Sequence, residues 1–434
     1  MKRKFIIKIV SIILAICTLI PMSGCDMIGL GGKSCSHLIT TEFVKKEATC
    51  TEEGVLVIRC LTCKKEQTRI IEKESHSLVV DEVNGVYKCS KCSYEKPMVN
   101  PDIQTSGEIS FHFMKLGNEY AGDCTYINAG GLDILIDAGS RTSSIPFIAE
   151  YLDKYVDDGK LEYVIATHAD QDHIAGFSKR NGSIFDLYEC EIIIDFPLTN
   201  KTSQTYNNYL LERDEEVRGG ALHYTALECY KNLNGGQRIF NLSRDGSLQM
   251  EILYNYFYEH KTSDENDYSV CLQFIQGERK FLFTGDLEKD GEEYLVENND
   301  LSQVELFKAG HHGSKTSSND CLLDVIKPKI CVCCCCAGSV EYTQNLQNTF
   351  PTQDFINRIS KHTDKVYVPI MIDVVYDDTK QKYKNEEEYI ELNGNVVVTS
   401  NSSGVSVNCS NNNTLLKDTE WFKNNRITPM NWAN

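Results

Sequence analysis

The 434-residue sequence has no long hydrophobic run after residue 24. A membrane-spanning helix needs about 20 mainly apolar residues, so we expect no transport channel in the rest of the chain. Positive charge is also scarce, because 62 acidic residues outnumber 44 lysines and arginines and leave a formal net charge of −18. Such a chain is not expected to hold nucleic acid broadly on a basic surface. Bound metal ions can still attract an anionic substrate locally.

The remaining composition, 41% hydrophobic and 24% charged, is that of an ordinary globular protein. A length of 434 residues exceeds what a single core usually supports. We therefore expect one large domain accompanied by one or two smaller segments.

The first segment has the pattern of an export signal. A basic start is followed by an apolar run over residues 9–20 and by the small residues that precede Cys25, so residues 1–24 are interpreted as a signal peptide. The ending resembles a bacterial lipoprotein lipobox, with Met22 where leucine is more usual. That resemblance implies lipidation of Cys25 and a tether over residues 25–33. The alternative is an uncleaved anchor helix. With either, we expect an extracytoplasmic protein attached to the cell membrane.

Residues 34–97 form a cysteine-rich segment with an internal repeat. Each unit has a Ser-His pair, a β-rich run and a CxxC turn. A CxxC turn lets two thiolates point at one ion, so the two turns predict a zinc-ribbon-like structure with a structural zinc. The predicted ligands are Cys60, Cys63, Cys89 and Cys92. Disulfides are the alternative, since export permits them, and a segment this small needs one or the other. A linker is expected over residues 98–107.

Residues 108–405 alternate short apolar runs with helix-like segments, which predicts an α/β domain with helices covering the sheets. A tail is expected over residues 406–434. The predicted strands lie in residues 109–116, 133–139, 161–168, 190–196, 268–275, 280–286, 304–310 and 328–336. The predicted helices lie in residues 143–158, 288–298, 318–327 and 352–363.

Ligand-type side chains follow several of these strands. The loop THADQDHIAG, residues 167–176, carries two histidines and two aspartates, and Asp286 follows another strand. Strand ends meet at one edge of a sheet, so we expect a dinuclear metal site with ions roughly 3.5 to 4 Å apart. In this prediction His168 and Asp170 hold one ion, Asp172 and His173 hold the other, and Asp286 bridges both.

The order of the motifs DAG, THADQDHIAG, LFTGD and KAGHHGSKTSS resembles the metallo-β-lactamase fold, and specifically the hydrolase domain of ComEC-type competence proteins. The resemblance covers about residues 109–400 and implies an αββα sandwich. The chain departs from the pattern in three places. Ala175 replaces a second glycine, the first-strand motif is stretched to KLGNEYAGD, and PTQDF replaces a GHP-like turn. His223 and His260 have no matching context and are not assigned to metal.

The resemblance also implies roles for single residues. The implied metal ligands are His168, Asp170, Asp172, His173, Asp286, His311 and His312, with at least one of the last two facing the ions. Asp172, Asp286 and His312 are the expected catalytic residues, and Asp137 is expected to support the ligands from behind. Asp170 adds a hard oxygen ligand and the cluster has no cysteine, which favours manganese relative to zinc. Ser314 and Lys315 either contact a substrate anion or belong to a solvated loop.

The run ICVCCCCAG places four consecutive cysteines, residues 333–336, on a predicted strand. Successive side chains of a strand point to opposite faces, so the four cannot converge on one ion. Cysteine is small and readily buried. We therefore interpret the run as a buried strand.

These observations predict a membrane-tethered hydrolase with two divalent ions, zinc or manganese, that cleaves a phosphodiester. The resemblance to ComEC-type proteins makes DNA the first substrate to consider, and the chain would then be a tethered nuclease. One alternative is hydrolysis of another phosphorylated cell-envelope or small-molecule substrate. Another is a non-catalytic surface binding protein whose working part is the cysteine repeat.

Overall fold

The computed structural model describes residues 39–71, 73, 76, 78–81, 86–97 and 107–433. The predicted signal peptide, Cys25, the tether and nearly all of the predicted linker lie outside these residues. Within the described part of the chain, no helix is both long and apolar enough to cross a membrane. The chain divides into two compact units, one made by residues up to 47 with 54–71 and the other by residues 48–53 with everything from 72 onward.

The first unit is a three-stranded antiparallel sheet with β2 in the centre. Its strands are β1 (Thr40–Lys46), β2 (Gly54–Cys60) and β3 (Glu66–Ile71). Only the central strand contributes buried side chains, Val57 and Cys60 among them, whereas β1 is exposed along its whole length. Three strands with so little apolar surface lack the core that keeps a small sheet folded.

A second small sheet belongs to the other unit and has the order β4-β5-β6. Its strands are β4 (Leu78–Asp81), β5 (Val86–Cys89) and β6 (Glu95–Pro97). Of the second CxxC pair, Cys89 ends β5 and Cys92 lies in the turn before β6.

The large domain contains an eight-stranded sheet of order β12-β11-β10-β9-β8-β7-β25-β26. The four strands from β9 to β12 are parallel, and the others pair antiparallel. The strands are β7 (Ile109–Phe113), β8 (Thr125–Ala129), β9 (Leu132–Ile136), β10 (Lys160–Ile165), β11 (Glu189–Asp195), β12 (Leu222–Thr225), β25 (Val396–Asn401) and β26 (Gly404–Cys409).

A seven-stranded sheet of order β13-β14-β15-β16-β17-β18-β20 lies against the first. Its strands are β13 (Ile239–Asn241), β14 (Leu248–Ile252), β15 (Leu272–Gln276), β16 (Arg279–Phe283), β17 (Leu306–Lys308), β18 (Ile330–Val332) and β20 (Val366–Tyr367). Two smaller sheets follow, formed by β19 (Cys336–Ala337), β21 (Ile370–Met371) and β24 (Ile390–Glu391), and by β22 (Val374–Asp377) with β23 (Lys382–Asn385).

Alternating side chains of β16 explain why the two sheets pack together. Phe281 and Phe283 point toward Phe111 of the other sheet, with ring centroids 4.7 and 5.7 Å apart. Leu282, between them, instead joins a second core with Leu295 and other helix residues. A strand whose two faces are both apolar must be covered on both sides.

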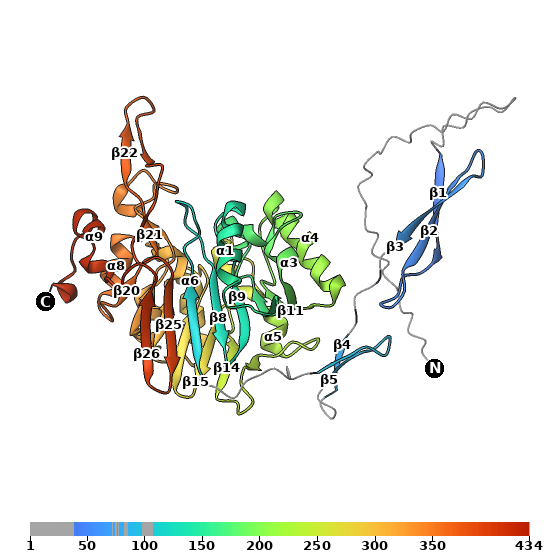
Figure 1. The fold of residues 1–434 in the computed structure, drawn as a ribbon, viewed down its shortest axis with the longest axis horizontal. Coiled ribbons are helices and arrows are strands. Elements are labelled where there is room, and N and C mark those ends of the chain that lie inside the picture. Colours follow the sequence, from blue (N-terminus) through green and yellow to red (C-terminus); the bar gives the residue numbers. More distant parts are fainter. Residues whose placement is uncertain are drawn as a thin grey trace, which may run out of the picture. The chain divides into compact units, whose positions relative to one another are not determined.

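Helices supply the outer layers (Figure 1). On the seven-stranded sheet the second core contains side chains of α6 (Lys289–Asn298), α7 (Asp320–Ile326) and α8 (Gln353–Ile359). The remaining helices are α1 (Ile145–Leu152), α2 (Gln171–Ile174), α3 (Ile184–Leu187), α4 (Gln204–Gly219), α5 (Ala226–Lys231) and α9 (Glu420–Asn425). Among these, α1 and α3 pack into the core that contains the eight-stranded sheet. The predicted αββα sandwich is confirmed.

Each of the eight predicted strands and four predicted helices has a counterpart in the structure. Helix α4 was not predicted, although it is 16 residues long. Only Tyr209 and Glu212 of this helix are buried. An amphipathic helix is recognised by its apolar stripe, and that of α4 is short, since Tyr206 and Leu210 are only partly buried against the core.

The cysteine run departs from the prediction in one respect. Strand β18 ends at Val332, and Cys333 to Cys335 are not part of a strand. All four cysteines are buried, as predicted, and neighbours face different cores. Cys333 and Cys335 join the core beneath α7 and α8, while Cys334 joins the core between the sheets.

The C-terminal residues are not a separate tail. Strand β26 continues to Cys409 and pairs with β25. Leu416, Trp421, Phe422 and Trp432 are buried in the core with α7 and α8. Two tryptophans are the largest apolar side chains available to a core, so the segment after residue 405 belongs to the large domain.

Candidate active site

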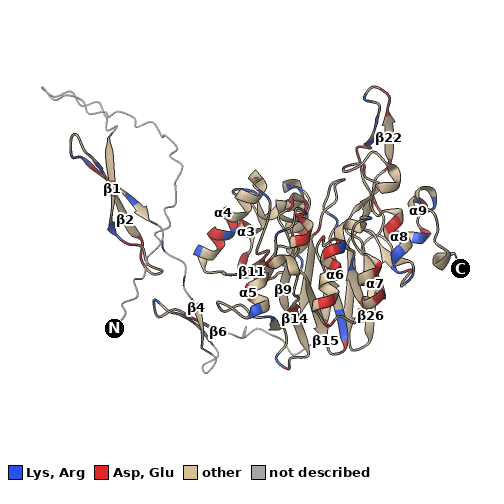
Figure 2. Cartoon of the chain, turned by 180° about the vertical axis from the view of Figure 1, so that it is seen from behind, with Lys and Arg blue, Asp and Glu red and all other residues tan. Residues whose placement is uncertain are grey.

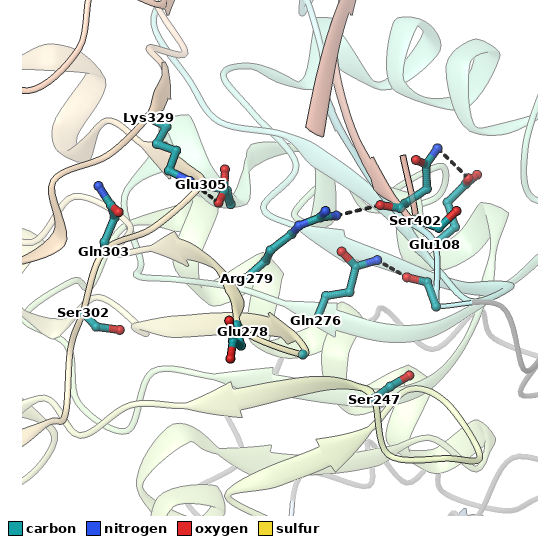
Figure 3. Close-up of a pocket in the computed structure, with 13 residues that line it drawn as sticks. Glu108, Ser247, Gln276, Glu278, Arg279, Ser302, Gln303, Glu305, Lys329 and Ser402 are labelled. Atoms are coloured by element: carbon teal, nitrogen blue, oxygen red, sulfur yellow. Dashed lines mark hydrogen bonds and ion pairs between the residues drawn. The ribbon is translucent and has the colours of Figure 1, made fainter. Parts of the chain in front are cut away.

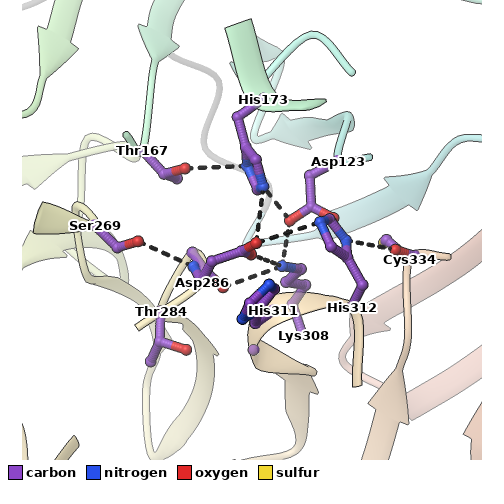
Figure 4. A network of polar contacts seen from close by, with 12 residues as sticks. Asp123, Thr167, His173, Ser269, Thr284, Asp286, Lys308, His311, His312 and Cys334 are labelled. Carbon is purple, nitrogen blue, oxygen red and sulfur yellow. Dashed lines mark hydrogen bonds and ion pairs between the residues drawn. The ribbon is translucent and has the colours of Figure 1, made fainter. Parts of the chain in front are cut away.

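Five segments bring polar side chains to one end of the two large sheets (Figure 4). Asp137 follows β9, the loop 167–176 follows β10, and Asp286 follows β16. The 3-10 helix Gly310–Gly313 follows β17, and Asp123 lies just before β8. Because all five meet here, residues distant in sequence form one buried group.

The loop 167–176 is held by hydrogen bonds to Asp137. The backbone N–H and the hydroxyl of Thr167 both donate to this carboxylate at 2.8 Å. Asp137 itself has a left-handed φ of 59°, a conformation that aspartate tolerates better than most residues. At the end of the loop, a Cβ on Gly176 would lie 2.4 Å from the carbonyl oxygen of Ala138, so only glycine allows this close approach.

Asp123, His173, Asp286 and His312 form the tightest group. One ligand atom from each lies within 4.8 Å of all the others, and all four residues are buried. The Nε2 atoms of His173 and His312 lie 3.1 and 3.2 Å from Oδ2 of Asp286. Carboxylates and imidazoles that converge in a buried site are ligands for divalent ions.

Two further predicted ligands extend this group. Asp172 places Oδ2 at 3.3 Å from Nε2 of His312. His168 is fully buried, with Nε2 at 3.7 Å from Oδ2 of Asp170. Asp170 also forms an ion pair with Lys201. The structure therefore brings His168, Asp170, Asp172, His173, Asp286 and His312 together.

Unpartnered nitrogen atoms test whether this group fits a metal. The Nε2 atoms of His168, His173 and His312 are buried and have no hydrogen-bond partner among the described residues. A buried polar atom left without a partner costs roughly 1 to 3 kcal/mol. Three such atoms facing carboxylates fit divalent ions, which would complete their coordination.

In two of these imidazoles the other ring nitrogen, Nδ1, has a hydrogen-bond partner behind it. Nδ1 of His173 lies 2.7 Å from Oδ2 of Asp137, and Nδ1 of His312 lies 2.8 Å from the carbonyl oxygen of Cys334. Such partners hold the proton on Nδ1 and leave Nε2 free to bind a metal. Asp137 is thus placed where the predicted supporting role requires it.

The charges of the group are strongly coupled. Burial raises the pKa of Asp286, but His173, His312 and Lys308 lower it further, so the pKa lies well below the ordinary value. Burial lowers the pKa of His173, but Asp286 and Asp137 raise it well above the ordinary value. The carboxylates therefore favour the protonated imidazole of His173, whereas burial and the neighbouring His173 hold the pKa of His168 well below its ordinary value.

Two members of the group were not predicted as site residues. Lys308 is buried, contacts Asp123, and lies 3.3 Å from Oδ1 of Asp286. Burial lowers its pKa, but Asp123 and Asp286 raise the pKa above the ordinary value. The signals were the acidic residue of AGDCTYI and the lysine of KAGHHG. Asp123 was not recognised because the first motif is stretched, and Lys308 was not recognised because it lies in an apolar strand.

The two histidines of the HHG motif point to different places. Both residues have left-handed φ values, 44° for His311 and 53° for His312. This turn sends His312 into the buried group, whereas Nδ1 of His311 lies 3.0 Å from Oε1 of Glu288 and its side chain is 24% exposed. His312 is therefore the member placed to bind a metal.

A cavity of about 310 Å³ leads from the surface to the group. Arg141, Asp170, Asp172, His311 and Tyr342 are among its lining residues. The hydroxyl of Tyr342 donates to Oδ2 of Asp172 at 2.9 Å.

The two predicted anion contacts differ in exposure. Lys315 is exposed, whereas Ser314 is buried, with Oγ 2.8 Å from Oγ1 of Thr316. Lys315 is therefore the more accessible of the two.

A larger pocket, about 1100 Å³, has no comparable chemistry (Figure 3). Its charged groups are already engaged, since Lys329 pairs with Glu305 at 2.6 Å. Arg279 donates to Oγ of Ser400 at 2.9 Å and to the carbonyl oxygen of Asn401 at 2.6 Å. These contacts tie the two sheets together, and we assign no site here.

In the cysteine-rich segment, the second CxxC pair has neighbours that were not predicted as zinc ligands. Cys89 and Cys92 gather with Cys50 and His76. Cys60 ends β2 and is buried, and Cys63 is exposed in the turn that follows. The group beside the second CxxC pair therefore differs from the predicted set.

Comparison with known proteins agrees with this site. The metallo-β-lactamase superfamily model matches residues 117–179 and 262–336. ComE operon protein 3 of Bacillus subtilis is 24% identical over 210 residues, which cover 48% of this chain and 23% of that protein. Competence protein ComA of Neisseria gonorrhoeae is 36% identical over 111 residues, covering 25% of this chain and 15% of that protein. Recombination protein 2 of Haemophilus influenzae is 26% identical over 215 residues, covering 49% and 22%.

These matches span less than a quarter of each relative's length. A solved metallo-β-lactamase from Cronobacter sakazakii gives a TM-score of 0.26 at 13% identity, over 47% of this chain and 78% of that one, which is too low to support a conclusion. The two matched ranges contain the loop 167–176, Asp286 and the HHG pair. The predicted resemblance is confirmed: the large domain matches the metallo-β-lactamase superfamily model over these two ranges and is similar in sequence to part of the ComEC-type competence proteins.

Proposed function

We propose that the large domain is a metal-dependent hydrolase that cleaves phosphodiester bonds, with DNA as the first substrate to test. The observation that carries the proposal is the convergence of three buried imidazole nitrogens, none with a hydrogen-bond partner among the described residues, on the carboxylates of Asp170, Asp172 and Asp286. The relatives are named for competence and recombination, and that is the reason for choosing DNA.

Two divalent ions fit the donor set. His168 and Asp170 would hold one, Asp172, His173 and His312 would hold the other, and Asp286 lies where it can serve both. When bound, such ions lower the pKa of water and stabilise negative charge on a phosphoryl group. Zinc and manganese both accept these ligands, and the carboxylates favour manganese.

The protein's own residues would bind and orient the substrate. Arg141 lines the cavity that leads to the group, and Lys201 pairs with Asp170 at its edge. Both cations are partly exposed and can meet a phosphate oxygen. Figure 2 shows acidic and basic positions mixed along α4 and α6, so anion binding would be local to the cavity.

The same proposal includes a place in the cell. Residues 1–25 carry the signal and lipobox-like pattern, and we propose that Cys25 anchors an extracytoplasmic enzyme to the membrane. Cys25→Ala is expected to abolish labelling with a radioactive or clickable fatty acid. Unchanged labelling of the variant would refute the anchor without affecting the proposal for the large domain.

The activity is tested on the full chain supplied with manganese, magnesium or zinc. The substrates are single-stranded DNA, duplex DNA and bis-p-nitrophenyl phosphate, with a β-lactam as the comparison. We expect phosphodiester cleavage that needs the metal, and no β-lactam cleavage. Activity on bis-p-nitrophenyl phosphate without activity on DNA would keep the phosphodiesterase and redirect the search to other phosphorylated substrates.

Asp286→Asn is the inactive control, because it keeps the shape of the side chain and removes its charge. Asp300→Asn is the matched control, since Asp300 is exposed and lies ahead of β17, away from the strand end that carries the site. Two results would overturn the proposal and favour a non-catalytic binding protein. Either the wild-type protein binds no divalent ion, or the wild type and Asp286→Asn cleave the substrate at the same rate.

A further inference from the structure

Cys50, His76, Cys89 and Cys92 form a compact group in the second structural unit. One ligand atom from each lies within 4.8 Å of all the others. Sγ of Cys50 is 3.8 Å from Sγ of Cys89, and Sγ of Cys92 is 3.4 Å from Nδ1 of His76. Cys50 and Cys89 are buried, and Cys92 is partly buried.

These spacings are those of a tetrahedral zinc site. Two thiolates about 2.3 Å from a tetrahedral zinc ion lie about 3.8 Å apart, and a thiolate and an imidazole nitrogen lie about 3.5 Å apart. A disulfide would need sulfur atoms about 2.05 Å apart. The separation of Cys50 and Cys89 therefore matches a shared ion and not a covalent bond.

The backbone prepares Cys89 and Cys92 for this role. The N–H of Lys91 donates to Sγ of Cys89, and the N–H of Tyr94 donates to Sγ of Cys92, both at 3.4 Å. Donors aimed at sulfur stabilise the thiolate, the form that binds metal. The two bonds fold the CxxC turn so that both sulfurs point to the same side.

The other two ligands are also held in place. The hydroxyl of Thr49 accepts hydrogen bonds from the N–H groups of Thr51 and Glu52, at 3.3 and 3.0 Å, in the turn that carries Cys50. The ring of His76 stacks on Tyr94 with a centroid distance of 4.2 Å and an interplanar angle of 11°. Each side chain is thus oriented by a contact that does not use its ligand atom.

We propose that these four residues bind one structural zinc ion, with Cys50 replacing the first CxxC pair of the predicted zinc ribbon. The ion would fasten the turn 48–53 to the β4-β5-β6 sheet. The small number of buried side chains explains why this segment needs a bound ion. Among the described residues of 39–97, the buried apolar side chains are Ala48, Cys50, Val57, Cys60 and Cys89. A sheet with so small a core depends on a staple.

Cobalt distinguishes this site from the active-site group. Thiolate ligands give tetrahedral Co²⁺ a charge-transfer absorption in the near ultraviolet, and the group around Asp286 contains no cysteine ligand. The full chain is stripped of metal under reducing conditions and titrated with Co²⁺. We expect a thiolate band in the wild type that disappears when zinc is added in excess.

Variants then identify the ligands. Cys50→Ser, His76→Ala and Cys89→Ser are each expected to lose one equivalent of thiolate-bound cobalt, and Cys50→Ser/Cys89→Ser should lose no more than Cys89→Ser. Cys409→Ser, in the large domain, is the matched control and should lose nothing. If Cys60, Cys63, Cys89 and Cys92 shared one ion, Cys50→Ser would keep the full band, and that result would overturn the proposal.

A measurement on the wild type covers the case in which a variant fails to fold. In zinc-loaded protein, Cys50, Cys89 and Cys92 should resist alkylation by iodoacetamide, and a chelator should make all three reactive together. Peptide mapping reads each cysteine separately. A Cys50–Cys89 disulfide in protein purified without reductant, with no bound zinc, would overturn the proposal in favour of a covalent staple. Neither result depends on hydrolase activity.

Discussion

The chain places two groups of metal-ligand side chains in very different surroundings. The group around Asp286 consists of carboxylates and imidazoles and lies in a domain with two extensive apolar cores. The group around Cys89 consists of three cysteines and a histidine, in a segment with few buried side chains. Both groups are compact. The first lies beside a cavity of about 310 Å³ that reaches the surface, and a smaller pocket of about 190 Å³ is lined in part by His76 of the second.

If both proposals hold, the contrast separates a metal used for chemistry from a metal used for folding. A domain with its own core keeps its shape without an ion, so its ligands can serve a reaction at strand ends. A small segment gains its folding free energy from the ion itself. The two groups also differ in their ligand atoms. Four nitrogen and sulfur ligands complete the coordination of a structural ion, whereas a catalytic site leaves a position for water or substrate.

The largest effect should follow from Asp286→Asn, the change that attacks the first group alone. We expect hydrolysis to fall by at least about 10³-fold, because the charge between the two proposed ion positions is lost. Metal content of the large domain should fall as well, while the cobalt–thiolate band stays. Steady-state kinetics and metal analysis of the same preparation check this result, and a variant with both ions and normal turnover would contradict it.

Removal of all metal should unfold one region and spare the other. After chelation we expect β4, β5 and β6 to lose amide protection by at least about 10²-fold, because the ion supplies their stability. Amides of β7 to β11 should change far less. Hydrogen exchange followed by mass spectrometry reads both regions in one experiment. Equal loss in both would mean that the large domain also depends on metal to fold.

Asp137→Asn should have a smaller effect than Asp286→Asn. The amide still accepts from Thr167, but it no longer holds the imidazole of His173 through a charged oxygen. Loss of such a supporting carboxylate typically costs about 10 to 100-fold in metal affinity or rate. Metal titration with turnover measured at saturating metal tests it. An effect as large as that of Asp286→Asn would show that Asp137 contacts the ion itself.

Lys315→Ala should have the smallest effect. Its side chain is exposed, three residues after His312, and we proposed it only as a contact for an anionic substrate. We expect KM to rise by about two- to fivefold with kcat unchanged, as for the loss of uniform binding. Kinetics at several salt concentrations measure this, and no change in KM would assign Lys315 to a solvated loop.

The sequence was sufficient for the large domain because its signals are local. Strands such as β16 are short apolar runs, and the ligand residues directly follow them, so periodicity and order predict their meeting. Asp123 and Lys308 were missed because they reach the group from a stretched motif and from a buried strand position. The lysine of KAGHHG is visible in the sequence, but its burial beside two carboxylates is a property of the assembled site.

The cysteine-rich segment shows the opposite case. Pairing the two CxxC turns follows from sequence symmetry, but Cys50 joins the second turn from a loop between β1 and β2. The ligands of a metal ion depend on which turns lie close together in the folded protein. A repeat of two similar units in the sequence does not show which turns these are. The helix α4 was missed for a related reason, because its polar surface gives no periodic signal.

The central claim, two metal sites of different kinds in one chain, is tested most directly by anomalous diffraction. Crystals of the full chain grown with zinc and manganese are measured on both sides of each absorption edge. We predict a zinc peak among Cys50, His76, Cys89 and Cys92, and metal peaks beside the Nε2 atoms of His168, His173 and His312. A map with no anomalous peak beside those three imidazoles would contradict the account.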